Sequence, residues 1–316
     1  MFDVICVGEM VIDFLPGEQP GHYLRNAGGA PANVAIAIAR NGLRSGFIGK
    51  MGNDDFGRFL VDTLIENKVA YLGGELTDEA VTTMAFVSLD AHGDRSFTFA
   101  RKPGADMLLH PADIDEQIIK NCKIVHAGSC SLSASPADAA TLQAMKYGKS
   151  LGKLISFDVN YRNLLWSNQT EKAVQKIREV LPLVNLLKIS EEETELFGGE
   201  EQIPDLMKEN GIALLIMTRG PRGAKAYWQE EIIDVPGLPG GAVDATGAGD
   251  AFWGAFLSTL LNQDVTQPSE LTCEKILKAM NYGNVAGTLC VRKKGAISSL
   301  PTRTEIADYL QSEGEK

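Results

Sequence analysis

A glycine-rich turn followed at once by a carboxylate lies in residues 243–256, which read V-D-A-T-G-A-G-D-A-F-W-G-A-F. Gly247, Ala248 and Gly249 are too small to cover their own backbone, and the apolar run after them predicts a buried helix. Such a turn directs free N–H groups and the positive end of the helix dipole at one point, which favours an anion. Asp250 is either a partner of the helix end or a proton acceptor. An anion cradle beside a proton acceptor suits transfer of a phosphoryl group to a hydroxyl group.

A second pair of glycines lies near the amino terminus, before a predicted helix of small residues. Within residues 26–57, Gly28 and Gly29 allow a ligand to approach the backbone closely, and residues 32–40 predict a tightly packed helix. Asn33 lies in the first turn of that helix. Its amide is either a helix-end partner or a polar group for a hydroxylated ligand, and the spacing leaves both interpretations open.

The rest of the chain alternates short apolar strands with helices, which predicts a mostly parallel sheet covered by helices. The predicted strands are residues 2–8, 44–49, 123–127, 153–158, 184–189 and 213–218. The predicted helices are residues 54–67, 136–152, 170–181, 191–197, 203–210 and 272–290; in the first of them the inward residues are Phe56, Phe59, Leu60, Leu64 and Ile65. Polar residues follow several strands: Asp13, Asp158, Asn160, Arg162, Lys188, Ser190, Glu193 and residues 218–223. Because ligands bind at the carboxyl edge of such sheets, these side chains are expected to converge there.

Residues 69–101 interrupt this rhythm with short β segments. The segments are residues 70–76, 81–89 and 95–99, with a hairpin turn at His92, Gly93 and Asp94. Together with the alternating stretch after Glu9, they predict a small β-sheet lid formed from about residues 10–26 and 69–101. Arg101 follows the last segment and is either solvated or in contact with a substrate.

Composition excludes several classes of function. The net charge of −11 and the pI near 5.0 argue against nucleic acid as a partner, because no basic stripe is present. No apolar run approaches membrane-spanning length and no signal precedes the first strand, so a cytoplasmic protein without a membrane partner is expected. The five cysteines, an odd number and widely spaced, are expected to be buried thiols, and the four histidines lack metal-ligand spacing. The first strand ends in G-E-M, which does not provide the G-x-G-x-x-G of a dehydrogenase.

Two motifs carry a family resemblance. The stretches N-A-G-G-A-P-A-N-V-A and D-A-T-G-A-G-D-A-F resemble the two signatures of the PfkB, or ribokinase-like, family of carbohydrate kinases, in the right order and at the right separation. The stretches G-E-M-V-I-D-F-L-P and F-D-V-N-Y-R-N-L-L-W are similar to those of the family's fructokinases. The resemblance spans the chain and implies one kinase domain, residues 1–316, with a Rossmann-like three-layer α/β/α fold and a small β-lid. It also implies transfer of the ATP γ-phosphoryl group to the 6-hydroxyl of fructose.

The resemblance also implies roles for individual residues. Asp250 matches the catalytic base, the N–H groups of Gly247, Ala248 and Gly249 match the anion hole, and Arg162 supplies positive charge near the transferred phosphate. The implied sugar-binding residues, besides Asp250, are Asp13, Gly28, Gly29, Asn33 and Arg101. The implied ATP contacts are Lys188, Thr218, Gly220, Gly223, Gly249 and Asn284.

Two cation sites follow from the same resemblance. Glu193 is implied to organise Mg²⁺ through water, although Ser190 stands where many relatives have asparagine. A monovalent cation, with potassium as the expected ion, is implied at Asp244, Thr246, Gly295 and Ser299. Val159 replaces a proline common in the family, which changes a backbone preference and removes no chemistry.

Two alternative functions remain at this point. A sibling kinase acting on 2-keto-3-deoxygluconate or another ketose-like sugar has the same motifs, because the choice of sugar depends on lid side chains. A non-catalytic nucleotide or sugar sensor on the same fold is disfavoured by the intact G-A-G-D. The oligomeric state is a separate expectation. The lid strands leave an apolar face that needs cover, so a homodimer through the lid is expected.

Overall fold

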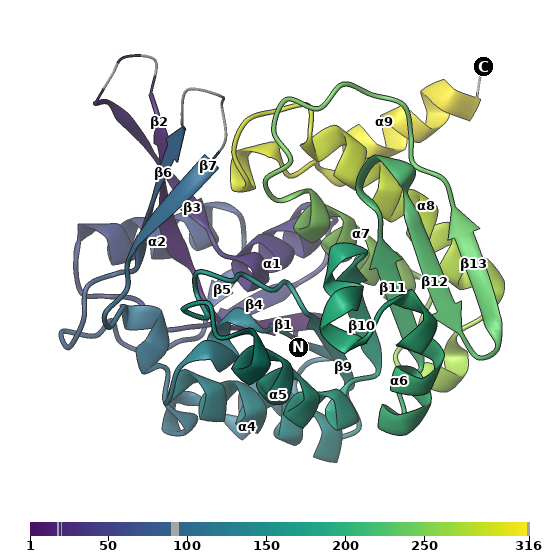
Figure 1. The fold of residues 1–316 in the computed structure, drawn as a ribbon, viewed down its shortest axis with the longest axis horizontal. Helices are drawn as coiled ribbons and strands as arrows, with labels where there is room; N and C mark the ends of the chain where they lie inside the picture. Colours follow the sequence, from purple (N-terminus) through teal and green to yellow (C-terminus); the bar gives the residue numbers. More distant parts are fainter. Residues whose placement is uncertain (18, 20, 90–94, 315–316) are drawn as a thin grey trace.

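Apolar runs form the strands of a nine-stranded sheet in the computed structural model, which describes residues 1–17, 19, 21–89 and 95–314 (Figure 1). The strand order is β13-β12-β11-β10-β9-β8-β1-β4-β5. All neighbours from β5 to β11 in this order pair in parallel. These strands are β1 (Val4–Val7), β4 (Ser45–Ile48), β5 (Ala70–Tyr71), β8 (Ile124–Gly128), β9 (Leu154–Asp158), β10 (Leu186–Ser190) and β11 (Leu214–Thr218). Their carboxyl ends therefore meet at one edge, as the sequence predicts.

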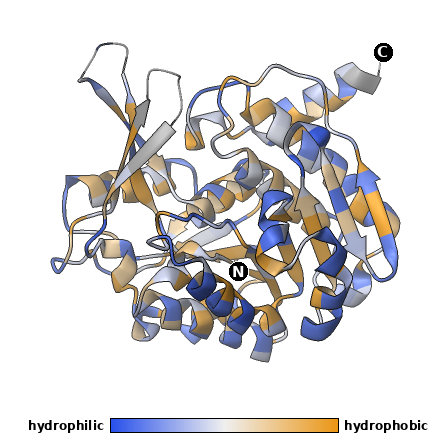
Figure 2. Cartoon of the chain, viewed as in Figure 1, coloured by the Kyte–Doolittle hydropathy of each residue, from blue (hydrophilic) through white to orange (hydrophobic). Residues whose placement is uncertain are grey.

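Helices cover both faces of this sheet, because its strands are apolar on both sides. In β1, Val4 and Cys6 point into one core and Ile5 and Val7 into the other. The first core is covered by α1 (Ala30–Arg40), α2 (Asp55–Glu66), α7 (Ala248–Asn262), α8 (Cys273–Cys290) and α9 (Arg303–Gly314). The second core is covered by α3 (Glu116–Lys120), α4 (Ala137–Ser150), α5 (Thr170–Val180) and α6 (Ile203–Asn210). Figure 2 shows the apolar strands enclosed by helices with hydrophilic outer faces, which confirms the three-layer prediction.

A separate four-stranded sheet stands at one end of this body (Figure 1), in the order β3-β2-β6-β7. Its strands are β2 (Val11–Pro16), β3 (Tyr23–Gly28), β6 (Met84–Leu89) and β7 (Arg95–Ala100). Phe14 of β2 stacks on Phe86 of β6 at 4.9 Å between ring centroids and meets Phe56 of α2 edge-on at 5.6 Å. Aromatic packing thus fixes one face of the small sheet against α2.

The structure corrects several expectations. Residues 70–71 form β5 of the central sheet instead of a lid strand, and Ile65 is 60% exposed because the buried stripe of α2 runs through Leu60 and Leu64. Residues 192–197 are a 3₁₀ helix. The antiparallel edge strands β12 (Ala224–Trp228) and β13 (Glu231–Val235) were not expected. The predicted hairpin turn at residues 92–94 lies outside the described residues.

The cysteines and the helix lengths bear on the expectations about thiols and membranes. All five cysteines are free; Cys6, Cys122, Cys130 and Cys290 are buried, whereas Cys273 is exposed at the start of α8, contrary to expectation. No helix within the described ranges has the length and apolar character needed to cross a membrane.

Candidate active site

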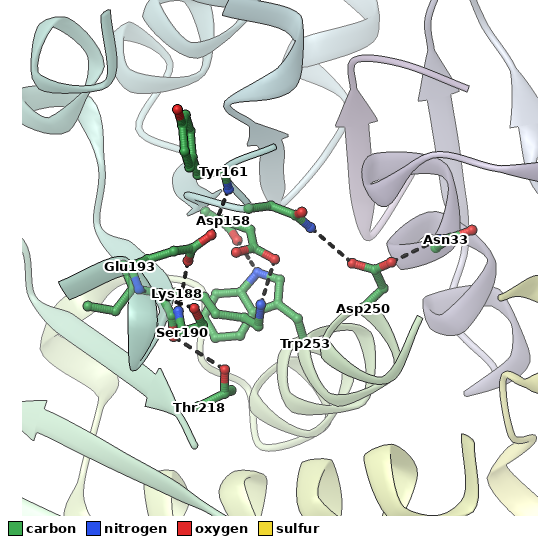
Figure 3. Close-up of polar contacts among 12 residues, drawn as sticks. Asn33, Asp158, Tyr161, Lys188, Ser190, Glu193, Thr218, Asp250 and Trp253 are labelled. Carbon is green, nitrogen blue, oxygen red and sulfur yellow. Dashed lines mark hydrogen bonds and ion pairs between the residues drawn. The ribbon is translucent and has the colours of Figure 1, made fainter. Parts of the chain in front are cut away.

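Asp250 lies in the first turn of α7, directly after the glycine turn. Gly247 precedes the helix with a φ of 80°, a left-handed conformation that glycine adopts without strain. The Asp250 side chain is 7% exposed, accepts a hydrogen bond from Asn33 Nδ2 at 2.8 Å and a longer one from Asn160 Nδ2 at 3.4 Å (Figure 3). These amides come from α1 and from the segment after β9, so two elements distant in sequence from α7 orient its carboxylate.

Close packing of α1 on α7 requires small residues where the two helices touch. A Cβ on Gly254 of α7 would come within 2.5 Å of the Ala37 side chain of α1. This close approach brings Asn33 within hydrogen-bond distance of Asp250. The asparagine is therefore a partner of the carboxylate, and its own Oδ1 is buried without a hydrogen-bond partner among the described residues.

The environment of Asp250 keeps the pKa of its carboxyl close to the pH range in which a general base works. Burial raises its pKa to about 6, the hydrogen bond from Asn33 lowers it, the nearby Asp158 raises it, and the charges of Lys188 and Arg162 lower it. The carboxylate form therefore predominates at neutral pH, while the proton affinity is greater than that of an exposed aspartate.

A buried ion pair lies beneath the glycine turn. The strand register places Lys188 of β10 opposite Asp158 of β9, and Lys188 Nζ donates to Asp158 Oδ2 at 2.7 Å. A Cβ on Gly249 would lie 3.3 Å from Lys188 Nζ, so the lysine sits directly under the turn. Burial lowers the pKa of Lys188, but the charges of Asp158, Glu193 and Asp250 and the hydrogen bond to Asp158 together outweigh burial, and the pKa lies above its usual value. The ammonium group of Lys188 thus places positive charge close to the turn.

Glu193 lies on the 3₁₀ helix η5 (Glu192–Phe197) after β10. Its Oε1 accepts from the Tyr161 N–H at 2.6 Å, and its Oε2 accepts from the Ser190 N–H at 2.8 Å (Figure 3). Burial, and then the nearby Asp158, raise the pKa of Glu193. Both oxygens are thus engaged by backbone groups, which fits a metal contact through water better than direct coordination. Among the described residues, no three His, Cys, Asp or Glu side chains form a group that could hold a metal ion.

Of the four predicted monovalent-cation residues, Thr246 and Gly295 both donate hydrogen bonds to Asp244. Asp244 accepts from the Thr246 N–H at 3.0 Å and hydroxyl at 2.7 Å, and from the Gly295 N–H at 3.1 Å. Ser299 ends the 3₁₀ helix η9 (Ile297–Ser299) and is 1% exposed. Its hydroxyl has no hydrogen-bond partner within the described part of the chain, which leaves a buried oxygen available for a cation.

Of the predicted sugar residues, Asp13 lies directly against Gly28. Asp13 was expected beyond the carboxyl end of the first strand, within the lid stretch of residues 10–26, and it lies inside β2, opposite Asn26 of β3. A Cβ on Gly28 would come within 2.1 Å of Asp13 Oδ2, so only glycine leaves room for this carboxylate. Burial raises the pKa of Asp13 to about 6, and Arg162 lowers it. The exposed Arg162 therefore influences the carboxyls of both Asp13 and Asp250.

The Arg101 side chain is not solvated but takes part in buried contacts, and its predicted contact with a substrate stays a prediction. Its Nη2 lies 2.7 Å from Asp106 Oδ2, and its Nη1 donates to Ser133 Oγ at 3.1 Å. Nothing in the sequence pattern pointed to Asp106 as its partner.

The remaining predicted ATP contacts line the ends of β11 and α8. Thr218 ends β11, Gly220 and Gly223 have φ of 55° and 89°, and a Cβ on Gly223 would strike the Val235 carbonyl oxygen at 2.2 Å. Asn284 of α8 donates to the Pro236 carbonyl oxygen at 3.1 Å. Gly223 and Asn284 thus also hold the segment that follows β13.

A buried polar network behind the ion pair was not expected to bear on the site. Ser156 Oγ contacts Trp253 Nε1 and His126 Nδ1, both at 2.9 Å. Trp253 lies one turn after Asp250, so this network fastens α7 to the sheet. Burial lowers the pKa of His126 to about 4, so this histidine is a neutral residue of the core.

This fold and this site are those of a sugar kinase family: the model of the pfkB family carbohydrate kinases matches residues 1–303, and the chain belongs to that family. The chain is 41% identical over 321 residues to Fructokinase-1 of Oryza sativa subsp. japonica, covering 98% of each. It superposes on a fructokinase with bound ATP from Xylella fastidiosa with a TM-score of 0.91 at 30% identity, covering 99% of each chain. A fructokinase from Vibrio cholerae O395, in a form with bound fructose, ADP and calcium ion, gives a TM-score of 0.86 at 34% identity, covering 98% of this chain and 99% of that one.

Proposed function

We propose that the protein is an ATP-dependent fructokinase that phosphorylates the 6-hydroxyl of D-fructose, with Asp250 as the general base. The observation that carries this proposal is a buried carboxylate, oriented by Asn33 and Asn160, in the first turn of a helix that begins at a glycine turn. The fructokinases among its relatives and structural neighbours supply the choice of sugar.

In this mechanism the sugar hydroxyl attacks the γ-phosphorus of ATP in line with the leaving ADP oxygen. A bond forms between the sugar oxygen and phosphorus, the bond from phosphorus to ADP breaks, and the hydroxyl proton passes to Asp250. Because burial raises the pKa of Asp250 to about 6, the group is ionised at neutral pH and can accept this proton. The hydrogen bond from Asn33 holds the accepting carboxylate in place.

The glycine turn stabilises the charge that develops on the phosphoryl group. The first N–H groups of α7, from Ala248 and Gly249, have no intrahelical acceptor, and with Gly247 they face the same end of the helix dipole. The Ala248 N–H also lies 3.2 Å from the Ala245 carbonyl oxygen, so in the proposal it is shared between the turn and the anion. Arg162 and Lys188 add positive charge to an otherwise acidic protein.

Two cations complete the proposed site. Mg²⁺ supplies charge neutralisation for the phosphates of ATP, and Glu193 would hold it through water, because both carboxylate oxygens already accept backbone N–H groups. Potassium beside the turn would be held by Asp244, Thr246, Gly295 and Ser299. The buried hydroxyl of Ser299 supports this second assignment.

The proposal treats residues 1–316 as one kinase domain with the small sheet as a lid that excludes water from the sugar. It also includes a cytoplasmic homodimer joined through that sheet. Support for the dimer comes from the edge strand β3, where Leu24 is 61% and Tyr23 45% exposed. Sedimentation at micromolar concentration tests it, and a monomer there contradicts it.

The direct test measures ADP release with Mg-ATP and potassium across fructose, 2-keto-3-deoxygluconate, ribose and glucose. Fructose-selective turnover that disappears in Asp250→Asn is expected. Asp138→Asn is a matched control, since it removes a carboxylate bound to Lys176 on the far helices α4 and α5. Selectivity for another sugar would overturn the choice of fructose, and binding without turnover would indicate a sensor.

A further inference from the structure

The small sheet joins the body at four places in the chain. The chain enters β2 after Glu9 and Met10 and leaves β3 at Gly28, and it enters β6 after Thr83 and leaves β7 at Arg101. Buried polar groups of one cluster, here called the hinge cluster, contact all four places. The hinge cluster consists of Glu9, Thr83, Arg101, Asp106 and Ser133.

Asp106 is the centre of the hinge cluster. It lies on the 3₁₀ helix η1 (Ala105–Leu108) and is 4% exposed. Its Oδ1 accepts a short hydrogen bond from the Thr83 hydroxyl, and its Oδ2 accepts from Arg101 Nε at 2.9 Å and pairs with Nη2 at 2.7 Å. One carboxylate therefore ties the start of β6 to the end of β7.

The hinge cluster is also fixed to the body of the protein. Arg101 Nη1 donates at 3.1 Å to Ser133, the last residue of the 3₁₀ helix η3 (Cys130–Ser133), which packs under α4. A Cβ on Gly104 would lie 1.7 Å from Thr83 Oγ1 and 2.9 Å from Asp106 Oδ1. The glycine at this position is thus a requirement of the cluster, because any side chain would separate Thr83 from Asp106.

Glu9 connects the hinge cluster to the places where the chain enters β2 and leaves β3. Its Oε1 accepts from the Ala30 N–H at 3.3 Å, immediately after the Gly28–Gly29 pair, and its Oε2 is buried without a partner among the described residues. Burial and the charge of Asp106 raise the pKa of Glu9 to about 7, against the opposing effects of backbone N–H groups and of the charge of Arg101, so Asp106 and Arg101 lie within electrostatic reach of Glu9. The nearby Cys130 thiol is the other titratable group that faces this carboxyl.

The cluster has a direct path to the proposed sugar site. Asp13 of β2 pairs with Ala85 of β6, two residues after Thr83, and the Ile12 N–H donates to the Thr83 carbonyl oxygen at 2.9 Å. The position of Asp13 therefore depends on where β6 begins, which the bond between Thr83 and Asp106 determines. Arg101, taken alone as a sugar contact from the sequence, is bound to Asp106 and Ser133.

We infer that Asp106 is a positioning residue of the sugar kinase: through Thr83 and Arg101 it sets the place of the small sheet, and so of Asp13, over the sugar. This inference rests on the proposed function, because it concerns the sugar of that reaction. Asp106 touches neither substrate, so its loss affects binding of the sugar and leaves ATP binding and the base unchanged.

The test compares Asp106→Asn with the wild-type enzyme. Asparagine keeps an oxygen for Thr83 but removes the charge that holds Arg101. The expected result is a rise of about tenfold or more in KM and in the calorimetric Kd for fructose, with KM for ATP within about twofold. ADP released per sugar phosphate formed is expected to rise, since a misplaced sheet admits water. Asp138→Asn, which also loses an ion pair, is expected to change none of these quantities.

A second variant keeps the inference testable if Asp106→Asn fails to fold. Thr83→Val removes the hydroxyl and leaves the side-chain volume nearly unchanged. It is expected to raise KM for fructose by about threefold, again without an effect on KM for ATP. A folded Asp106→Asn or Thr83→Val with wild-type KM and Kd for fructose overturns the inference, as does an equal change in both KM values. If the wild-type enzyme binds fructose weakly but phosphorylates another sugar, the same KM and Kd comparisons are made with that sugar. A wild-type protein that binds no sugar overturns the proposed function and the inference with it.

Discussion

Replacing Asp250 by asparagine is expected to stabilise the protein while it abolishes activity. The carboxyl has an ordinary pKa of 3.8 and, in the fold, a pKa of about 6, mainly because it is buried. The shift is about two units at about 1.4 kcal/mol each, so the ionised base reduces the free energy of unfolding by about 3 kcal/mol. Asparagine has the same shape and no charge, and Asn160 can turn its free Oδ1 toward the new amide.

The sign of the pH dependence follows from proton binding. Because the folded pKa is the higher one, the native state holds more protons than the unfolded chain between about pH 4 and pH 6. The free energy of unfolding therefore falls as pH rises through this window, and above it the whole reduction caused by the ionised Asp250 is present. The advantage of Asp250→Asn is expected to be about 3 kcal/mol at pH 8 and about 1 kcal/mol at pH 4.5.

Urea denaturation of both proteins at these two pH values, at low protein concentration, measures this difference. Asp138→Asn serves as the control: it breaks an ion pair with Lys176, so no gain in stability is expected at either pH. An Asp250→Asn variant that is no more stable than the wild type at pH 8 would refute the reasoning. So would an advantage that does not shrink at the lower pH.

Three further outcomes are expected at the same site. Gly247→Ala is expected to lower kcat and to cost about 1–2 kcal/mol of stability in denaturation, because alanine disfavours a φ of 80° and its Cβ would lie 3.1 Å from Ala296 Cα. Ser299→Ala is expected to abolish activation in a potassium titration without lowering the potassium-free rate; unchanged activation would remove Ser299 from the cation site. The pH profile of kcat/KM is expected to fall below about pH 6 as Asp250 protonates. Asn33→Ala is expected to move that fall to higher pH, because the hydrogen bond from Asn33 lowers the pKa of the base and its loss raises that pKa.

The sequence predicts the edge of the sheet on which the site lies, because parallel strands have their carboxyl ends together. It cannot predict the pairing of Lys188 with Asp158, which depends on the register between β10 and β9. Likewise, the bond from Asn33 to Asp250 joins residues 217 positions apart and requires the close packing of α1 on α7. Both contacts are tertiary, so residue type and spacing leave them open.

The expectations that were wrong concern weak local signals. A two-residue strand such as β5 has no periodicity of its own, so residues 70–71 could not be separated from the lid by pattern alone. Ile65 looks apolar and inward, yet Thr63 takes the buried position because its hydroxyl bonds to the Phe59 carbonyl oxygen at 2.8 Å. The hairpin of β12 and β13 did carry a weak signal, aromatic and β-branched residues on both sides of Gln229, which has a φ of 54°.

The most direct test of the central claim is a single-turnover experiment. The wild-type enzyme and Asp250→Asn, each in excess over Mg-ATP and saturated with fructose, are quenched at intervals, and the fructose phosphate formed is measured. The account predicts a rate of phosphoryl transfer at least about 100-fold lower in Asp250→Asn, with calorimetric binding of fructose and ATP retained. Transfer at the wild-type rate by a variant that binds both substrates would contradict the assignment of Asp250 as the base.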